Sequence, residues 1–441
     1  MNLKDAVEQL ENDYSFRQGV VFKHYIPSVE GEYKDFPADC DPALISVLKG
    51  KGIDKLYSHQ SRAYELGASR CSFVVVTPTA SGKTLCYNLP ILDAILKNPD
   101  TRSLYIFPTK ALAQDQLAEL HETLTMLEKG IKAFTYDGDT PVDARRSVRH
   151  AANLVITNPD MLHTGILPHH TKWISLFENL QYVVLDEIHS YRGVFGSHMA
   201  HVIHRLKRVA RYYGSDPVFI ASSATIANPE ELAEKLVGQP FVGIRESGAP
   251  RGGKYFIFYN PPVINEDLGI RRSSLNESRR IASHFLDRGL KTIAFARSRL
   301  KVEVLGKYLR DKESTRARPR VIKTYRGGYL PNERRAIEQG LREGKIDGVV
   351  STNAMELGVD IGELDVCVMA GYAGSIASTW QQAGRAGRRS KASAAVLVAS
   401  SAPVDQYLVR HPQYFLEQTP EMGLINPDNV IIKAEHLKCA C

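Results

Sequence analysis

The sequence predicts an α/β fold with two tandem domains, each built on a mainly parallel β-sheet. Short runs of β-branched and aromatic residues alternate with segments of helical periodicity, which is the pattern of β-α-β units. The alternation occurs twice, and a Gly/Pro-rich segment at residues 247–253 separates the two series. A chain of 441 residues with 43% hydrophobic content is large enough for two or three ordinary cores.

The two series of predicted strands define the domains. The first series lies at residues 73–76, 103–107, 154–157, 182–185 and 218–221. The second lies at residues 254–259, 292–296, 320–325, 348–352, 366–370 and 394–399. We therefore expect an N-terminal extension with one short helix, two domains and a tail, at residues 1–54, 55–248, 249–412 and 413–441.

Charge is distributed unevenly along the chain. The segment from Arg271 to Lys345 holds 21 Lys/Arg and 8 Asp/Glu, whereas the whole chain carries a formal charge of only +7. The rest of the chain is therefore net negative. A solvent-exposed helical surface is the simpler explanation for one such cluster, and a polyanionic partner is the functional one.

The cysteines and the apolar runs predict a cytoplasmic protein. None of the cysteines forms a Cys-x-x-Cys pair, and no Cys/His arrangement has zinc spacing. The N-terminus lacks an apolar signal core, and no apolar run approaches the roughly 18 residues of a membrane span. The six cysteines, which we expect to be free thiols, stand at positions 40, 71, 86, 367, 439 and 441.

The segment Thr77–Thr84 (TPTASGKT) lies between the first predicted strand and a predicted helix. A glycine-containing loop that ends in Gly-Lys-Thr is typical of a phosphate-binding loop in this context. Backbone N–H groups around Gly82 and the start of the helix attract anions. Lys83 would reach the β- and γ-phosphates, and the Thr84 hydroxyl would bind Mg²⁺. The consensus has glycine where this chain has Thr77, and Gly-Lys-Thr alone also occurs in surface turns.

A pair of carboxylates, Asp186 and Glu187, follows the apolar run at 182–185. Ligands of open parallel sheets bind at the carboxyl ends of the strands, so Asp186 is expected to face the same crevice as Lys83. Asp186 would hold Mg²⁺, and Glu187 would orient or deprotonate a water molecule. Many strands end in acids, and the pair gains its significance from the upstream Gly-Lys-Thr loop.

Two further segments carry polar residues at expected element ends. Ser223-Ala224-Thr225 follows the strand at 218–221, where it could simply cap a helix. In the second half, residues 381–389 (QQAGRAGRR) place Arg385 and Arg388 three residues apart among glycines and alanines. They could form an arginine-rich surface turn, or they could stabilise charge on a transferring phosphoryl group.

Eight motifs, in this order and approximate spacing, resemble those of superfamily-two helicases over residues 55–400. The Asp-Glu-Ile-His sequence is similar to the DExH branch. Residues 248–252, 259–262 and 325–335 resemble the YprA/MrfA group of bacterial DNA helicases, which has RecQ-like eukaryotic relatives. The eight motifs are Gln60 and residues 77–84, 108–112, 157–160, 186–189, 223–225, 351–360 and 381–388.

The resemblance implies two RecA-like domains that bind ATP and Mg²⁺ between them. Adenine would be contacted by Tyr57 and Gln60, and the phosphates by Thr79, Ala80, Ser81, Gly82, Lys83 and Thr84. The second domain would contribute Gly358 and Asp360 to nucleotide binding and Gln381, Arg385 and Arg388 to catalysis. Coupling of the nucleotide state to movement would use His189, Ser223 and Thr225. Contacts to a nucleic-acid strand would involve Thr109, Lys110, Thr157, Ser351 and Thr352, with Arg326 and Arg335 nearby.

The activity implied is that of an ATP-dependent DNA helicase or translocase that moves 3′ to 5′ and serves DNA repair. Single-stranded or tailed duplex DNA would be its partner, with repair proteins as further partners, and the chain would act as a monomer. Members of the group continue into a region with a four-cysteine metal site, so residues 413–441 are expected to be a truncated tail. Two alternatives remain open: an RNA helicase, and an ATP-switched clamp that does not unwind.

Overall fold

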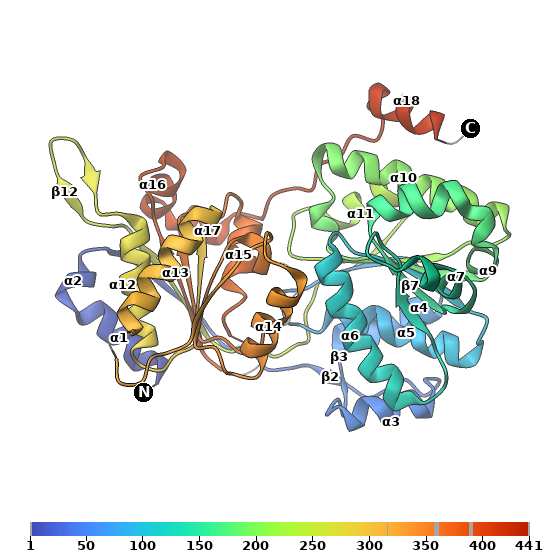
Figure 1. The fold of residues 1–441 in the computed structure, drawn as a ribbon, viewed down its shortest axis with the longest axis horizontal. Helices are drawn as coiled ribbons and strands as arrows, with labels where there is room; N and C mark the ends of the chain where they lie inside the picture. The colour runs from blue at the N-terminus through green and yellow to red at the C-terminus, as the bar shows by residue number, and fades with distance from the viewer. Residues whose placement is uncertain (1, 315, 357–360, 388–390, 440–441) are drawn as a thin grey trace. The chain divides into compact units, whose positions relative to one another are not determined.

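Two units, each with a seven-stranded sheet at its centre, make up the computed structural model (Figure 1). The structure describes residues 2–314, 316–356, 361–387 and 391–439. One unit contains Glu32–Ala249 together with Glu421–Cys441, and we call it the 32–249 unit. The other contains Met1–Gly31 together with Pro250–Pro420, and we call it the 250–420 unit.

The sheet of the 32–249 unit has the strand order β10-β4-β9-β8-β5-β7-β6, and all neighbouring strands are parallel. The central strands are buried on both faces, as expected for a parallel sheet flanked by helices. The strands are β4 (Phe73–Val76), β5 (Arg102–Ile106), β6 (Ala133–Thr135), β7 (Leu154–Thr157), β8 (Leu180–Leu185), β9 (Val218–Ser223) and β10 (Val242–Ile244).

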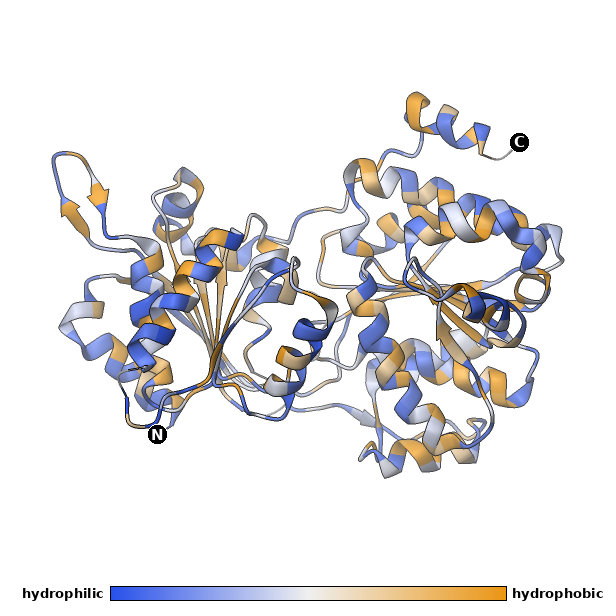
Figure 2. Ribbon diagram, viewed as in Figure 1, coloured by the Kyte–Doolittle hydropathy of each residue, from blue (hydrophilic) through white to orange (hydrophobic). Residues whose placement is uncertain are grey.

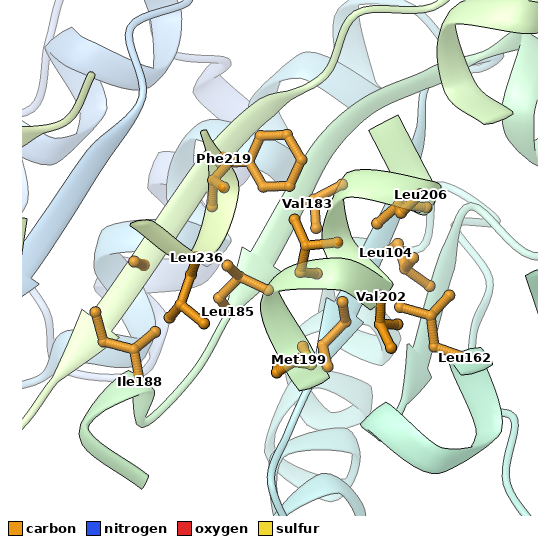
Figure 3. Packing of buried hydrophobic residues seen from close by; sticks show 14 of the residues in the cluster. Leu104, Leu162, Val183, Leu185, Ile188, Met199, Val202, Leu206, Phe219 and Leu236 are labelled. Carbon is orange, nitrogen blue, oxygen red and sulfur yellow. The ribbon is translucent and has the colours of Figure 1, made fainter. Parts of the chain in front are cut away.

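Two cores cover the faces of this sheet, because successive side chains of a strand point to opposite faces. Figure 3 shows one of them, in which Leu185 and Phe219 of the sheet lie in the same cluster as Met199 and Val202 of α10. This core is completed by α7 (Val142–Ala151), α9 (Ile174–Glu178), α10 (Gly193–Tyr212) and α11 (Pro229–Val237). The opposite face packs against α3 (Pro42–Gly50), α4 (Ser58–Ala68), α5 (Lys83–Lys97) and α6 (Lys110–Leu127).

The 250–420 unit repeats this architecture with one antiparallel edge strand, β1. Its order is β1-β11-β18-β17-β14-β16-β15, and Figure 2 shows that the strands are predominantly hydrophobic. The strands are β1 (Val20–Ile26), β11 (Lys254–Tyr259), β14 (Thr292–Ala296), β15 (Ile322–Tyr325), β16 (Gly348–Ser351), β17 (Val366–Ala370) and β18 (Ser393–Val398). The helices after β11 are α12 (Ser274–Leu286), α13 (Arg299–Glu313), α14 (Pro331–Arg342), α15 (Ile376–Ala383), α16 (Pro403–Arg410) and α17 (Pro412–Glu417).

The N-terminal segment is part of the 250–420 unit. Helix α1 (Leu3–Asn12) lies where Leu3, Val7 and Leu10 have helical spacing, and it packs with α2 (Tyr14–Arg17) against the core beside α12. The His284 ring nitrogen and the Ala6 carbonyl lie 2.8 Å apart. Strand β1 was not predicted, because most of its side chains are exposed at the sheet edge and give no clear alternation.

The C-terminal segment instead packs on the 32–249 unit. Helix α18 (Val430–Lys438) contacts α10, and the ring nitrogens of His436 and His198 lie 3.0 Å apart. The Gly423 N–H donates to the Asn228 side chain at 2.7 Å. The expected domain limits assigned residues 1–54 and 413–441 to separate end segments, whereas the contacts divide each of them between the two units.

Two of the passages from one unit to the other are hydrogen-bonded segments. Val29 and Arg251 exchange two backbone bonds, of 2.8 and 2.9 Å, within the 250–420 unit. Three residues further, within the 32–249 unit, the Glu32 N–H donates to the Gly248 carbonyl at 2.8 Å. The small pair β2 (Tyr33–Lys34) and β3 (Leu56–Tyr57) follows directly.

None of the helices in the described ranges is long and apolar enough to cross a membrane.

Leu10→Ala tests the integration of the N-terminal helix. Leu10 is fully buried in the core of the 250–420 unit, so its truncation is expected to lower the free energy of unfolding by about 2–5 kcal/mol. Glu8→Ala, on the exposed side of the same helix, serves as the control and should change it by less than about 0.5 kcal/mol. Urea unfolding provides the measurement, and equal stability of the two variants would contradict the packing described.

Candidate functional site

Three of the sequence motifs follow three adjacent strands, β4, β9 and β8. The Gly-Lys-Thr loop follows β4, Ser223–Thr225 closes β9, and Asp186–Glu187 follows β8. Because these strands are parallel neighbours, their carboxyl ends meet at one edge of the sheet. The sheet order therefore brings together residues that are more than 100 positions apart in the chain.

Backbone conformation and space explain the glycine of the loop. Gly82 has φ +78° and stands immediately before α5, and Ala80 also has a positive φ of 61°. A Cβ on residue 82 would come within 2.6 Å of the Gln60 amide nitrogen. A larger residue at position 82 would therefore be strained and would displace Gln60.

The lysine of the loop is bound by the loop itself. The Lys83 ammonium donates to the carbonyls of Thr77 and Pro78 at 2.8 and 2.9 Å. The hydroxyls of Thr77 and Ser81 share a bond of 2.6 Å in the interior of the loop. Thr77 thus makes a side-chain hydrogen bond that the glycine of the consensus could not make. A phosphate oxygen would compete with the two carbonyls for the ammonium protons.

Side chains from the start of α4 bind backbone carbonyls of the loop. The Gln60 carbonyl accepts from the Tyr57 N–H at 3.0 Å, and its amide donates to the Gly82 carbonyl at 3.0 Å. His59 accepts from the Gly248 N–H at Nδ1, so Nε2 carries the proton and donates to the Ser81 carbonyl at 3.0 Å. Burial lowers the pKa of His59 to about 4, which keeps this ring neutral. The Tyr57 ring is nearly parallel to the His59 ring at 5.8 Å.

Thr84 is oriented by two residues that the sequence analysis did not single out. Its hydroxyl donates to the Gln116 side-chain oxygen at 3.1 Å, and the Tyr87 hydroxyl donates to the same oxygen at 3.2 Å. Gln116 comes from α6, which begins at Lys110 after the helix cap Thr109. This shared acceptor holds the Thr84 oxygen at the first turn of α5.

Asp186 is a buried carboxylate held by Ser222 of the adjacent strand. The Ser222 hydroxyl donates to Asp186 and accepts from the Glu187 N–H at 3.4 Å. Burial, followed by the charge of Glu187, raises the pKa of Asp186 to about 7, whereas Ser222 and Lys83 oppose this rise. The Lys83 charge is therefore close enough to stabilise the carboxylate.

Glu187 adopts the left-handed conformation, with φ 52° and ψ 48°, at the turn after β8. Its carboxylate lies 3.3 Å from Nδ1 of His189. That nitrogen accepts from the Ala224 N–H at 3.1 Å, and burial lowers the pKa of His189 to about 3. The ring is therefore neutral, and the contact with Glu187 is not an ion pair although the two atoms are only 3.3 Å apart.

The residues of this edge suit a magnesium ion. Mg²⁺ is bound through one or two protein oxygens together with substrate phosphates. Asp186 supplies a buried carboxylate, and Thr84 supplies a hydroxyl. The two are close in space, because burial and then the charge of Asp186 raise the pKa of Tyr87, whose hydroxyl shares an acceptor with that of Thr84. A divalent cation would offset the cost of holding Asp186 ionised in this surrounding.

The remaining residues predicted for the 32–249 unit have varied surroundings. Thr109 is exposed and accepts from the Leu112 N–H at 3.3 Å, and Lys110 pairs with Asp139 at 3.0 Å. Thr157 is buried, and its hydroxyl donates to the Tyr136 carbonyl at 2.7 Å. The Ser223 hydroxyl donates to the Ala224 carbonyl, and Thr225 is exposed. Thr109, Lys110 and Thr225 thus offer accessible side chains, whereas Thr157 and Ser223 do not.

In the 250–420 unit, Glu356 joins the segments around residues 351–356 and 381–387. Its backbone carbonyl accepts from the Arg385 guanidinium at 2.8 Å, and its carboxylate accepts from the Gln382 amide at 2.9 Å. Gln381 is buried beside them. Glu356 was not among the predicted site residues. Of the predicted residues in these segments, Gly358, Asp360 and Arg388 lie outside the described residues.

The predicted strand contacts of this unit differ in accessibility. Ser351 is fully buried, and Thr352 caps the short helix at Asn353–Met355 by accepting from the Ala354 N–H at 3.3 Å. Arg326 pairs with Glu303 at 2.9 Å and lies over the Tyr329 ring, whereas Arg335 is exposed on α14. Among these residues, Arg335 presents the most accessible cation.

The site residues that were not predicted are hydrogen-bond partners of residues that were predicted. Ser222 precedes the Ser223–Thr225 motif by one position, and the register that pairs Leu185 with Ala221 puts it beside Asp186. That register cannot be read from one sequence. His59, Gln116 and Glu356 carry no spacing pattern of their own.

Comparisons with known proteins match both units. Residues 57–232 fit the family model of the DEAD/DEAH box helicases, and residues 277–390 fit that of the helicase conserved C-terminal domain. The chain is 56% identical to the "uncharacterized ATP-dependent helicase YprA" of Bacillus subtilis, over 99% of this chain and 58% of the relative. It is 36% identical to the ATP-dependent helicase hrq1 of Schizosaccharomyces pombe, over 100% of this chain and 42% of the relative.

A solved structure is similar over the whole chain. The DUF1998 helicase MrfA bound to DNA and AMPPNP is 55% identical, with a TM-score of 0.95, covering 100% of this chain and 61% of that protein. MrfA bound to DNA alone gives a TM-score of 0.96 and 58% coverage of that protein. The chain thus spans about 42–61% of the length of these proteins.

Ser222→Ala tests the electrostatics of Asp186. A protonated carboxyl binds Mg²⁺ poorly, so Mg²⁺-dependent binding of a non-hydrolysable ATP analogue should weaken as the pH falls through about 7. Loss of the Ser222 bond removes a partner of the charged form and should move this midpoint up by about 1 pH unit. The measurement is a binding titration at pH 6 to 8.5.

Ser103→Ala is the matched control for this substitution. Ser103 is a buried strand serine in the same sheet, and its hydroxyl has no hydrogen-bond partner among the described residues. Its removal should leave the midpoint unchanged. An unshifted midpoint in Ser222→Ala would show that the serine does not stabilise the Asp186 carboxylate.

Proposed function

This chain belongs to the superfamily-two helicases, in the group of YprA and MrfA, and on that premise we propose that it is an ATP-hydrolysing motor that moves along DNA. The observation that carries the proposal is the meeting of the Lys83 loop, Asp186–Glu187 and the end of β9 at one edge of the sheet. A phosphate-binding loop beside a buried carboxylate and a second acid supplies the groups needed for phosphoryl transfer to water.

The residues divide the work of ATP hydrolysis. Tyr57 and Gln60 would contact the adenine, and the N–H groups of residues 79–84 with the Lys83 ammonium would bind the phosphates. Asp186 and Thr84 would hold Mg²⁺, which when bound neutralises charge on the phosphate oxygens. Glu187 would orient a water molecule and accept its proton.

The 250–420 unit would complete the reaction. Arg385 and Arg388 would stabilise the charge that develops on the transferring phosphoryl group, an effect of about 10³–10⁵ in rate for arginines in this role. Gln381, Gly358 and Asp360 would contribute beside them. The bond from Arg385 to the Glu356 carbonyl supports this role, because it limits the conformations of a long side chain.

A chain of contacts in the 32–249 unit supports coupling between nucleotide and movement. Glu187 lies against His189, and His189 accepts from the backbone N–H of Ala224, between Ser223 and Thr225. A change at the Glu187 carboxylate would therefore be felt at residues 223–225. The neutral ring suits this transmission, since it holds the backbone by one directional bond.

DNA is the proposed track. MrfA has been solved with DNA, and the basic excess in residues 271–345 suits a polyanionic strand. Exposed Thr109, Lys110 and Arg335, with Arg326 and Thr352, would contact strand phosphates, as would backbone groups near Thr157 and Ser351. Movement from 3′ to 5′, a monomeric state, and a role in DNA repair with repair proteins as partners are proposed from the family resemblance.

Glu187→Gln tests the hydrolytic mechanism. The amide keeps the size of the side chain but cannot accept a proton, so strand-stimulated ATP turnover should fall by about 100-fold or more while nucleotide binding changes little. Steady-state ATPase and binding titrations measure the two effects. Glu178→Gln, an exposed glutamate two residues before β8, should behave as the wild type. Turnover close to that of the wild type in Glu187→Gln would refute the assigned mechanism.

The double substitution Arg326→Glu with Arg335→Glu tests the track. Reversal of two charges near the strand should weaken single-stranded DNA binding and reduce its salt slope by about 1.4, which corresponds to two phosphate contacts. DNA affinity is measured over a salt series, with Arg62→Glu in the 32–249 unit as the control. An unchanged slope would exclude these arginines from the interface. Stronger ATPase stimulation by RNA than by a DNA of matched sequence would favour an RNA track instead.

A further inference from the structure

Lys254 is a partly buried cation at the first position of β11, in the 250–420 unit. Its ammonium donates to the carbonyl of Ala383 at 2.7 Å and to that of Ala386 at 2.6 Å. These carbonyls lie on either side of Arg385, at the end of α15 and in the following turn. Lys254 makes no ion pair within the described ranges of the chain.

A lysine at this position costs free energy, because its charge is removed from water. Burial lowers its pKa from the usual 10.5 to about 8, because the charged form loses its hydration. The carboxyl end of a helix attracts cations, and the two carbonyls supply part of the lost solvation. An apolar side chain of similar length would avoid the cost of burying a charge. The lysine is therefore expected to serve a purpose other than stability.

The segment that Lys254 holds is also fixed at two other points. The Arg385 guanidinium donates to the Glu356 carbonyl, and the Gly387 N–H donates to the Leu364 carbonyl at 2.8 Å. Gly387 has φ +84°, and a Cβ there would come within 2.3 Å of the Ser393 hydroxyl oxygen. Ser393 is the residue paired with Lys254 between β11 and β18. The backbone around Arg385 is thus tied to the sheet, and Lys254 supplies two of the bonds.

We propose that Lys254 is a positioning residue, which sets the place of Arg385 by binding the backbone carbonyls on both sides of it. The inference rests on the proposed function, in which Arg385 stabilises charge in the transition state. Displacement of a catalytic group by about 1 Å can reduce a rate by about 100-fold. Loss of the Lys254 bonds should therefore reduce kcat for ATP hydrolysis and leave KM and DNA affinity largely unchanged.

The test is a double-mutant cycle with Lys254→Met and Arg385→Ala in the full chain. Lys254→Met alone should lower DNA-stimulated kcat by about 10- to 100-fold. In the Arg385→Ala background the same substitution should change kcat by less than about 2-fold, because there is no guanidinium left to position. Lys23→Met is the matched control, since Lys23 lies on neighbouring β1, is more exposed and pairs with Glu11 at 2.7 Å.

The outcomes separate this inference from the proposed function. Equal losses in both backgrounds, or a wild-type kcat in Lys254→Met, would overturn the positioning role alone. An unchanged kcat in Arg385→Ala would overturn the role of Arg385 and, with it, that of Lys254. If Lys254→Met does not fold, Lys254→Arg and Lys254→Gln enter the same cycle. A loss in the glutamine variant that is rescued by arginine and absent without Arg385 would support the proposal, and any additive loss would refute it.

Discussion

The parallel pairing of β4, β9 and β8 is the constraint on which the candidate site depends. Parallel strands that are buried on both faces must be connected by helices, so each strand ends at the same edge of the sheet. The loop with Lys83, the carboxylate of Asp186 and the hydroxyl of Ser222 become neighbours for this reason. Hydrophobic burial on two sides of the sheet therefore supplies the rigidity that a phosphate site needs.

Much of the electrostatics of this edge is set by groups that never need to touch a substrate. Ser222 keeps Asp186 usable as an anion, His59 remains neutral while it supports the loop backbone, and Gln116 aims the Thr84 hydroxyl. Each does so with one or two directional bonds in a buried setting, where such bonds are strong. In the 250–420 unit, Glu356 and Lys254 support the arginine segment in the same manner.

The fold was predictable where local patterns carry it. Buried strands such as 73–76 and 366–370 have continuous apolar runs, and the two expected α/β domains with mainly parallel sheets are confirmed. Edge strands such as β1 and β10 escaped because they are largely exposed and have no such run. For the site, motifs identified the residues with chemistry, whereas their supports Ser222 and Lys254 depend on strand register and on contacts that are remote in sequence. The packing of residues 1–31 and 421–439 on different units has no local signature at all.

The paired segments at residues 29–32 and 248–251 have a mechanical consequence. Two backbone passages joined by hydrogen bonds form a ribbon rather than a single flexible tether. Each segment limits the backbone conformations open to the other, because a change in the backbone of Val29 would break its bonds with Arg251. A change of backbone conformation at one of the two segments would therefore reach a part of the chain more than 200 positions away.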